Sequence, residues 1–283
     1  MTAGTVAIRI RGVSHQFGEE GDARHVRALR DTSLDITRGE LLCLIGPSGC
    51  GKSTLLNVVG GLMAPTTGTV EVFDQKVAGP MPRDIAFVFQ ENALFPWNTV
   101  FENVNLGMVF QGVARAEREA RAHRSLEAVG LKDFAQHYPG QLSGGMRQRA
   151  ALARALSLET GILLMDEPFG ALDEMTRERL NDEVLRIWEQ TGTTIVFVTH
   201  SIPEAVYLSS RVVVMSPRPG RITKVVDIGL PRPRTDEVRE SEAYFALITE
   251  VREALRAGGE HGDAEVDGGP ASARRTAAEG AVG

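Results

Sequence analysis

Residues 46–54 have the residue types and the spacing of a phosphate-binding loop. They read GPSGCGKST and fit the pattern G-x-x-x-x-G-K-[ST]. Glycines allow backbone N–H groups to point inward around phosphate oxygens, and a helix that starts at the loop adds the positive end of its dipole. In this pattern Lys52 reaches the β- and γ-phosphates, and the Ser53 hydroxyl ligates Mg²⁺. The predicted nucleotide-binding residues are Gly46, Pro47, Ser48, Gly49, Cys50, Gly51, Lys52, Ser53 and Thr54.

The lysine of this loop is informative because lysine is scarce in the chain. Only four of the 31 basic residues are lysines, and one of them is Lys52. Its ammonium group is compact and flexible, unlike the planar guanidinium of arginine. The loop predicts nucleotide binding, but by itself it is compatible with kinases, GTPases and many ATPases.

Two consecutive carboxylates follow an apolar run further along the chain. The segment ILLMDEP predicts a buried strand that ends at Asp166 and Glu167. Buried strands seldom end in two carboxylates unless a cation or a proton has to be handled there. Asp166 suits Mg²⁺ binding, directly or through water, and Glu167 suits a base that polarises an attacking water. The alternative is a solvated strand end without a chemical role.

A second candidate anion site lies in QLSGGMRQR, residues 141–149. Gly144 and Gly145 precede a long helical pattern and leave backbone N–H groups exposed, and Ser143 adds a hydroxyl donor. A plain helix cap is the alternative.

His200 is a further candidate. It follows the apolar run TIVFVT, where a single histidine is more often structural than functional.

Together these motifs resemble the ABC ATPase family, and the resemblance runs in order from about residue 6 to 225. It implies that Phe17 stacks on adenine and that Gln90 senses Mg²⁺ and the γ-phosphate and couples to membrane subunits. It also implies that His200 contacts the γ-phosphate, beside the catalytic Glu167 and the metal-binding Asp166. The family's signature corresponds to LSGGMRQR and binds the ATP of a second copy, while FGALD contacts that copy. The residues carried over to these two roles are Ser143, Gly144, Gly145 and Gln148 for the signature and Asp173 for the dimer contact.

Two stretches resemble a narrower group, the importers of nitrate, sulfonates, taurine and related small solutes. They are FQENALFPWNTVFENV (89–104) and RVVVMSPRPGRI (211–222). This resemblance implies an ATP- and Mg²⁺-dependent homodimeric motor, peripheral at the cytoplasmic face of the membrane. Its partners would be ABC permease subunits and, indirectly, a solute-binding protein. Phe95, Pro96 and Trp97 also suit docking from an exposed loop, although a turn inside the core is the alternative.

Two other functions within the family remain open at this point. An exporter motor is less favoured because exporter ATPases are often fused to membrane helices. A non-transport ABC protein acting on ribosomes or DNA is less favoured because that class usually joins two ATPase units in one chain. The net charge is 31 − 37 = −6, so no nucleic-acid partner is expected. A small-molecule kinase would leave LSGGMRQR unexplained.

The periodicity of apolar residues indicates the elements that must position these groups. Residues 6–17 alternate as an antiparallel strand does, and 33–36 is predicted to be its return partner. Apolar runs predict a buried parallel sheet and helical patterns connect them. The predicted buried strands are 41–45, 162–166, 194–199 and 212–215, and the predicted helices follow the phosphate loop and cover 113–129, 144–156 and 175–190. We expect an α/β P-loop NTPase with a mostly parallel sheet, an antiparallel β-rich N-terminal subdomain and an inserted helical signature subdomain at about 92–158.

Composition limits the class of protein and its expected location. Hydrophobic residues make up 42% and charged residues 24%, as in soluble globular proteins. The chain has neither an apolar run of about 18 residues nor a secretory signal, so a cytoplasmic location is expected. Cys43 and Cys50 lack the spacing of a zinc site, and neither a disulfide nor a metal role is expected. The ATPase domain is expected over 1–256, and the Gly- and Ala-rich segment 257–283 is predicted to be disordered.

Overall fold

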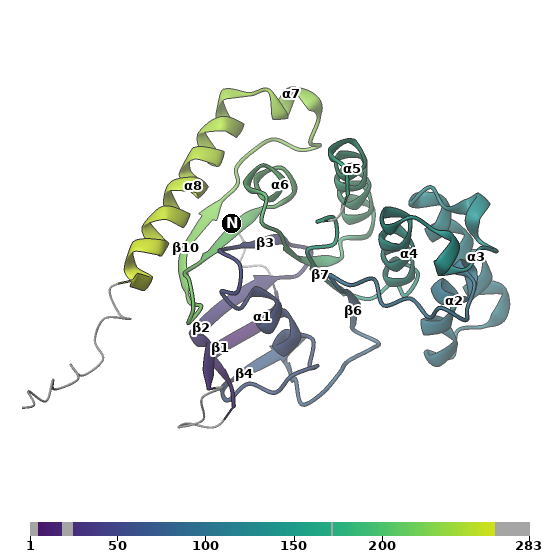
Figure 1. Cartoon of the computed structure of the whole chain (residues 1–283), viewed down its shortest axis with the longest axis horizontal. Coiled ribbons are helices and arrows are strands. Elements are labelled where there is room, and N and C mark those ends of the chain that lie inside the picture. Colours follow the sequence, from purple (N-terminus) through teal and green to yellow (C-terminus); the bar gives the residue numbers. More distant parts are fainter. Residues whose placement is uncertain (1–4, 19–24, 171, 264–283) are drawn as a thin grey trace, which may run out of the picture.

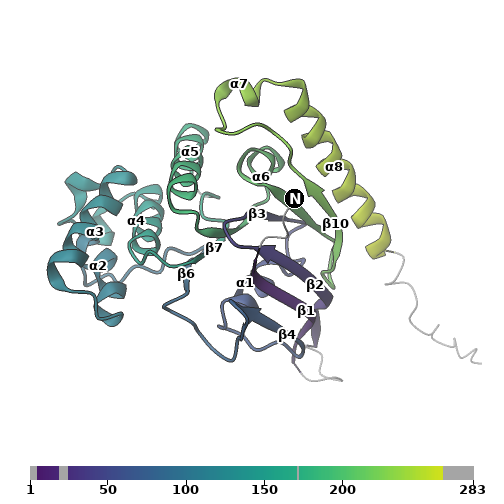
Figure 2. The same cartoon turned by 180° about the vertical axis from the view of Figure 1, so that it is seen from behind.

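The computed structural model describes residues 5–18, 25–170 and 172–263. Two sheets lie at the centre of these residues (Figure 1; Figure 2 shows the reverse side). The larger has the strand order β10-β9-β3-β8-β7-β6, and the smaller has the order β2-β1-β4-β5. The strands are β1 (Val6–Phe17), β2 (Val26–Thr37), β3 (Leu41–Ile45), β4 (Thr67–Val72), β5 (Gln75–Lys76), β6 (Ile85–Val88), β7 (Ile162–Asp166), β8 (Thr194–Val198), β9 (Arg211–Met215) and β10 (Ile222–Asp227).

The larger sheet is parallel except at one edge, where β10 runs antiparallel to β9. Every residue of β3, β7 and β8 is buried, as the continuous apolar runs require in a sheet covered on both faces. The carboxyl ends of parallel strands meet at one edge. That edge therefore receives the phosphate loop after β3, Asp166 at the end of β7 and His200 just after β8. The predicted α/β fold with a mostly parallel sheet is confirmed.

The smaller sheet is antiparallel and packs against the larger one across helix α1 (Lys52–Val59). Ile10 of β1, Leu44 of β3 and Leu56 of α1 belong to the same buried cluster. Gly51, at the start of α1, has a φ of 102°. A Cβ at this position would lie 2.8 Å from the carbonyl oxygen of Ala28 in β2. Glycine is therefore required where the phosphate loop lies against β2.

Three helices form the region that stands to one side of the sheets in Figure 1. They pack through side chains such as Met108, Leu126 and Leu152, which are fully buried. Thr99 and Glu102 form a capping box at the first of them, in which Thr99 Oγ accepts from Glu102 N and Glu102 Oε2 accepts from Thr99 N. These helices are α2 (Val100–Phe110), α3 (Arg115–Ala128) and α4 (Gly144–Leu156), with 3₁₀ turns at Lys132–Phe134 and Pro139–Gln141. The predicted subdomain limits of 92–158 stay a prediction.

Four more helices follow the signature segment, and the last of them extends into the segment that was predicted to be disordered. They are α5 (Glu174–Thr191), α6 (Ile202–Leu208), α7 (Asp236–Arg239) and α8 (Glu242–Asp263). Residues 257–263 are helical, so the prediction that disorder begins at 257 is wrong for them. Gly258 is buried against Thr223, and Lys224 Nζ bonds Glu250 Oε1 at 2.7 Å. This packing on β10 continues the helix despite its glycines. Residues 264–283 lie outside the described residues.

The bounds of the first two strands can be compared with the predicted ones. The first strand has the predicted bounds, whereas its return partner spans Val26–Thr37 instead of 33–36. Cys43 and Cys50 are free and buried. Of the described helices, none has the length and apolar character needed to cross a membrane.

Asn103 offers a test of how the segment before α2 is held. Its side chain is fully buried and accepts from Phe95 N at 2.8 Å, while Nδ2 donates to the carbonyls of Phe95, Asn98 and Thr99. Asn103→Ala should lower the free energy of unfolding by about 2 kcal/mol, because it removes the acceptor of the Phe95 N–H and the donor to three backbone carbonyls. Urea unfolding measures this change. Asn103→Asp should be at least as damaging, since its carboxylate would face carbonyl oxygens. Equal stability of Asn103→Asp and the parent would contradict this account.

Candidate ATP site

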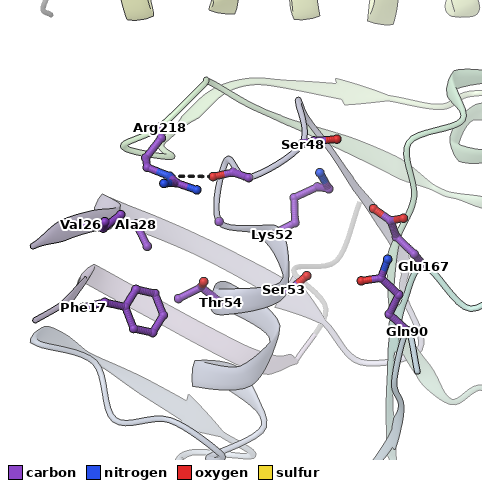
Figure 3. Close-up of a pocket in the computed structure, with 12 residues that line it drawn as sticks. Phe17, Val26, Ala28, Ser48, Lys52, Ser53, Thr54, Gln90, Glu167 and Arg218 are labelled. Carbon is purple, nitrogen blue, oxygen red and sulfur yellow. Dashed lines mark hydrogen bonds between the residues drawn. The ribbon is translucent and has the colours of Figure 1, made fainter. Parts of the chain in front are cut away.

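A cavity of about 540 Å³ lies at the edge of the larger sheet where the phosphate loop follows β3. The loop and the start of α1 form its floor, and Figure 3 shows side chains reaching it from several other segments. Phe17, Val26 and Ala28 line one part, while Gln90 and Glu167 line another. The structure thus brings together the loop, the predicted aromatic residue, the predicted glutamine and the predicted catalytic carboxylate.

Lys52 is buried beneath the loop, with 6% of its surface exposed. Its Nζ donates to the carbonyl oxygens of Gly46 at 2.9 Å and Pro47 at 3.1 Å. These bonds hold the ammonium group inside the curve of the loop, where Figure 3 shows it beside Ser48. A fixed cation inside a glycine-rich loop, next to a helix N-terminus, is an arrangement that binds phosphate.

Asp166 has the features of a residue that serves a cation. It is 7% exposed, and its Oδ1 atom is buried without a hydrogen-bond partner. Burial raises the pKa of Asp166, and the neighbouring Ser53 hydroxyl and Lys52 ammonium partly oppose that shift. Such an unpaired buried oxygen beside a hydroxyl fits Mg²⁺, which prefers oxygen ligands and keeps phosphate oxygens among them. Within the described residues, no cluster of three or more His, Cys, Asp or Glu could hold a metal by itself. A bound nucleotide would therefore have to complete the site.

Glu167 and His200 form a pair at the rim of the cavity. His200 Nδ1 lies 3.3 Å from Glu167 Oε2. The backbone of Glu167 has a φ of 44°, an unfavourable value for a residue with a side chain. Its N–H donates to the carbonyl of Val198 at 3.0 Å, which fixes the strained residue to the end of β8. The carboxylate is held next to the phosphate loop as a result.

The backbone of the segment that carries His200 is held by a buried carboxylate. Thr199 Oγ1 bonds Glu204 Oε2, and the same hydroxyl accepts from Ser201 N at 2.9 Å. Glu204 is 8% exposed, and burial raises its pKa. The imidazole of His200 remains exposed to solvent, and the anchored backbone places it beside Glu167.

Phe17 stands at the opposite part of the cavity from Glu167 in Figure 3. Its ring is 42% exposed and packs edge-on against His15, with 4.7 Å between ring centroids. An exposed aromatic face beside the apolar Val26 and Ala28 suits stacking on a planar base.

The signature residues lie away from this cavity within a single chain. Ser143 caps α4, where its Oγ accepts from Met146 N at 3.3 Å, and it is exposed together with Gly144. Gln148, a further residue expected to contact another copy's ATP, is buried within its own chain. It is 5% exposed and its Nε2 donates to the carbonyl of Phe89 at 3.3 Å. It lies four residues after the start of α4, where its side chain contacts its own chain beside Gln90, and its contact with a second copy's ATP stays a prediction.

Asp173 is an exposed helix cap outside the cavity. Its Oδ1 accepts from Thr176 N at 2.9 Å at the start of α5. This backbone hydrogen bond lowers the pKa of Asp173, so the carboxylate is charged at neutral pH. The single chain gives it no contact with the cavity.

Arg218 lines the cavity and was not among the residues singled out from the sequence. It comes from the turn between β9 and β10, where its Nε donates to the carbonyl of Gly49 at 3.1 Å (Figure 3). In the sequence, the stretch 211–222 supported only the resemblance to the importer group. No motif pattern assigned a phosphate-side position to this arginine.

Comparisons with known proteins agree with this geometry. Residues 29–170 match the family model described as ABC transporter. The chain is 47% identical over 248 residues to a taurine import ATP-binding protein of Jannaschia sp. (strain CCS1), covering 88% of this chain and 92% of that protein. It is 43% identical over 242 residues to a nitrate import ATP-binding protein of Synechocystis sp. (strain ATCC 27184 / PCC 6803 / Kazusa), covering 83% and 91%.

A solved structure is also similar. The dimeric structure of the ATP-binding cassette MJ0796, in a post-hydrolysis state with ADP and Pi, superimposes with a TM-score of 0.72 at 35% identity. The match covers 78% of this chain and 98% of that one.

The position of Glu167 generates a test of catalysis. Glu167→Gln should slow ATP hydrolysis by about 100-fold or more, because the attacking water loses its base, while ATP binding is retained. Single-turnover hydrolysis and equilibrium ATP binding separate the two effects. Lys52→Ala is the matched control, since it should weaken ATP binding itself by removing the buried cation. Ordinary turnover by Glu167→Gln would reject its catalytic role.

Proposed function

The chain belongs to the ABC transporter family, and from this premise we propose that it is the ATP-hydrolysing motor subunit of a multi-subunit importer. The observation that best supports the proposal is the convergence of distant segments on one cavity. The phosphate loop, Gln90 and Glu167 line it, and His200 bonds the catalytic carboxylate. A simple nucleotide-binding module would need the loop but not this carboxylate and histidine pair.

The proposed reaction is hydrolysis of the terminal phosphoanhydride bond of ATP. Glu167 orients a water for attack on the γ-phosphorus and accepts its proton, while the bond from the γ-phosphorus to the bridging oxygen breaks and ADP leaves. His200 orients the Glu167 carboxylate and contacts the γ-phosphate. Mg²⁺, when bound, neutralises charge on the phosphate oxygens, and Ser53, Asp166 and Gln90 would hold it.

We propose that two copies of the chain complete each other's ATP sites. In one copy the signature N–H groups of Gly144 and Gly145 are remote from the phosphate loop, yet they form an exposed helix N-terminus suited to an anion. Asp173 is exposed and charged at the start of α5, where it can contact a second copy. The dimeric state of the similar MJ0796 cassette supports this arrangement.

The segment before α2 is the proposed contact with permease subunits. Trp97 is 71% exposed and Phe95 is 38% exposed, and their ring centroids lie 5.4 Å apart. Asn103 fixes the backbone beneath them, and Arg154 of α4 donates to the carbonyls of Asn92 and Ala93. A rigid exposed aromatic pair suits a protein interface. The segment follows Gln90 in the chain, so the backbone joins the proposed docking surface to the cavity.

The transported solute is proposed from the relatives. Proteins named for taurine and nitrate import share more than two fifths of their residues with this chain. We propose a small solute of that kind, such as taurine, a sulfonate or nitrate. A solute-binding protein and the permease would select it. The chain would work at the cytoplasmic face of the membrane, held there by its partners.

Trp97 allows the docking proposal to be tested. Trp97→Ser should reduce the membrane-bound fraction of the tagged protein in cells that contain its permease, because it removes the exposed ring. ATP hydrolysis by the isolated chain should stay within about twofold, since Trp97 does not line the cavity. Fractionation and immunoblotting measure the first quantity. Phe245→Ser, which removes an exposed ring from α8, is the matched control. Equal membrane binding by Trp97→Ser and the control would contradict the proposal.

The shared-site proposal predicts opposite results for two tethered dimers of identical composition. In the first, one copy carries Lys52→Ala and the other carries Ser143→Arg, so both lesions fall in one composite site. In the second, a single copy carries both lesions, so each composite site is damaged. With Glu167→Gln in every copy to trap nucleotide, the first should retain about one ATP per dimer and the second none.

The reverse result would show that each chain uses its own signature. A parent tethered dimer that traps two nucleotides is the reference for a folded protein.

A further inference from the structure

Arg218 occupies a place in the cavity that neither the phosphate loop nor the signature accounts for. Its guanidinium lies against Gly49, and a Cβ at Gly49 would lie 2.9 Å from Arg218 Nη2. Gly49 has a φ of 74°, a conformation that favours glycine, and the absence of a Cβ there lets the guanidinium lie directly on the loop. The arginine therefore packs directly against the phosphate loop.

The turn that carries Arg218 is held rigidly. Ser216 is buried, and its Oγ donates toward the carbonyl of Pro217 and accepts from Arg221 N. Gly220 N donates to the carbonyl of Ala28 at 2.9 Å, and a Cβ at Gly220 would lie 1.8 Å from the carbonyl oxygen of Cys50. The turn is thus clamped between β2 and the phosphate loop. The backbone that carries Arg218 is thus held in place, and the exposed side chain is joined to the loop by the hydrogen bond from Nε to the carbonyl of Gly49.

The same contacts indicate which part of a nucleotide Arg218 faces. The turn is bonded to Ala28, which lines the cavity beside Phe17 and Val26, the proposed base-stacking part. Glu167 stands across the cavity from Arg218 in Figure 3. A nucleotide with its base on Phe17 and its γ-phosphate near Glu167 would bring the sugar and the first two phosphates past Arg218.

The charge of Arg218 is available for such a contact. Its one described hydrogen bond uses Nε and a neutral carbonyl, and no ion pair among the residues in 5–18, 25–170 and 172–263 includes it. Guanidinium groups present planar donors that match phosphate oxygens.

We propose that Arg218 is a second nucleotide-binding cation, which contacts the α- and β-phosphates of ATP and ADP. Lys52 holds the phosphates from inside the loop, and Arg218 holds them from its outer side. The γ-phosphate takes no part in this contact, so ATP and ADP gain equally from it. This inference rests on the proposed ATP site.

Calorimetric titration with Mg-ADP, and with Mg-ATP in the Glu167→Gln background, tests the inference. Arg218→Ala and Arg218→Gln should each raise the Kd for both nucleotides by about fivefold, because the site is open and the contact is partly screened. Arg218→Lys should stay within about twofold of the parent, since it keeps the charge. Arg256→Ala removes an exposed arginine of α8 that does not line the cavity, and it should bind like the parent.

Two results would overturn the inference. If Arg218→Gln binds like the parent, the residue only braces Gly49 through its hydrogen bond. If ATP binding weakens while ADP binding does not, the contact is with the γ-phosphate. A parent protein that binds neither nucleotide would instead contradict the proposed function. Unchanged melting temperatures of the variants show that the fold is intact in each comparison.

Discussion

The close approach of the phosphate loop to two other segments is the constraint on which the rest of the site depends. Gly51 touches β2 and Gly220 touches the loop at distances that leave no room for a Cβ atom. These two contacts join the smaller sheet and the β9–β10 turn to the loop. The aromatic ring of Phe17 and the guanidinium of Arg218 reach the cavity only because the backbones pack so closely.

The strand order of the larger sheet also determines the geometry of the site. β8 lies between β3 and β7, so the chain leaves three neighbouring strands at the same edge. The loop, the two carboxylates and the histidine are separated by more than 30 residues along the chain, yet this order brings them to one edge. Gln148 adds a bond from α4 to Phe89, so the signature helix is tied to the segment that contains Gln90.

Patterns in the sequence predicted the elements with strong periodicity or special residues. β1, β3 and β7 have continuous or alternating apolar side chains, and GPSGCGKST has four fixed positions. Other elements carried no such signal. In α2, apolar residues stand on several faces, and α8 continues through two glycines because it packs on β10. The positions of Arg218 and Gln148 depend on tertiary contacts with Gly49 and Phe89, which no local pattern contains.

The backbone of Glu167 has a consequence for how this protein tolerates heat. A residue with a side chain at a φ of 44° costs the folded state about 1 kcal/mol or more, and glycine would relieve that cost. Selection for thermostability alone would thus favour the loss of the carboxylate that we propose to be catalytic. Under the proposed mechanism, the glutamate represents a trade-off in which part of the folding free energy is given up to hold one side chain beside the phosphate loop.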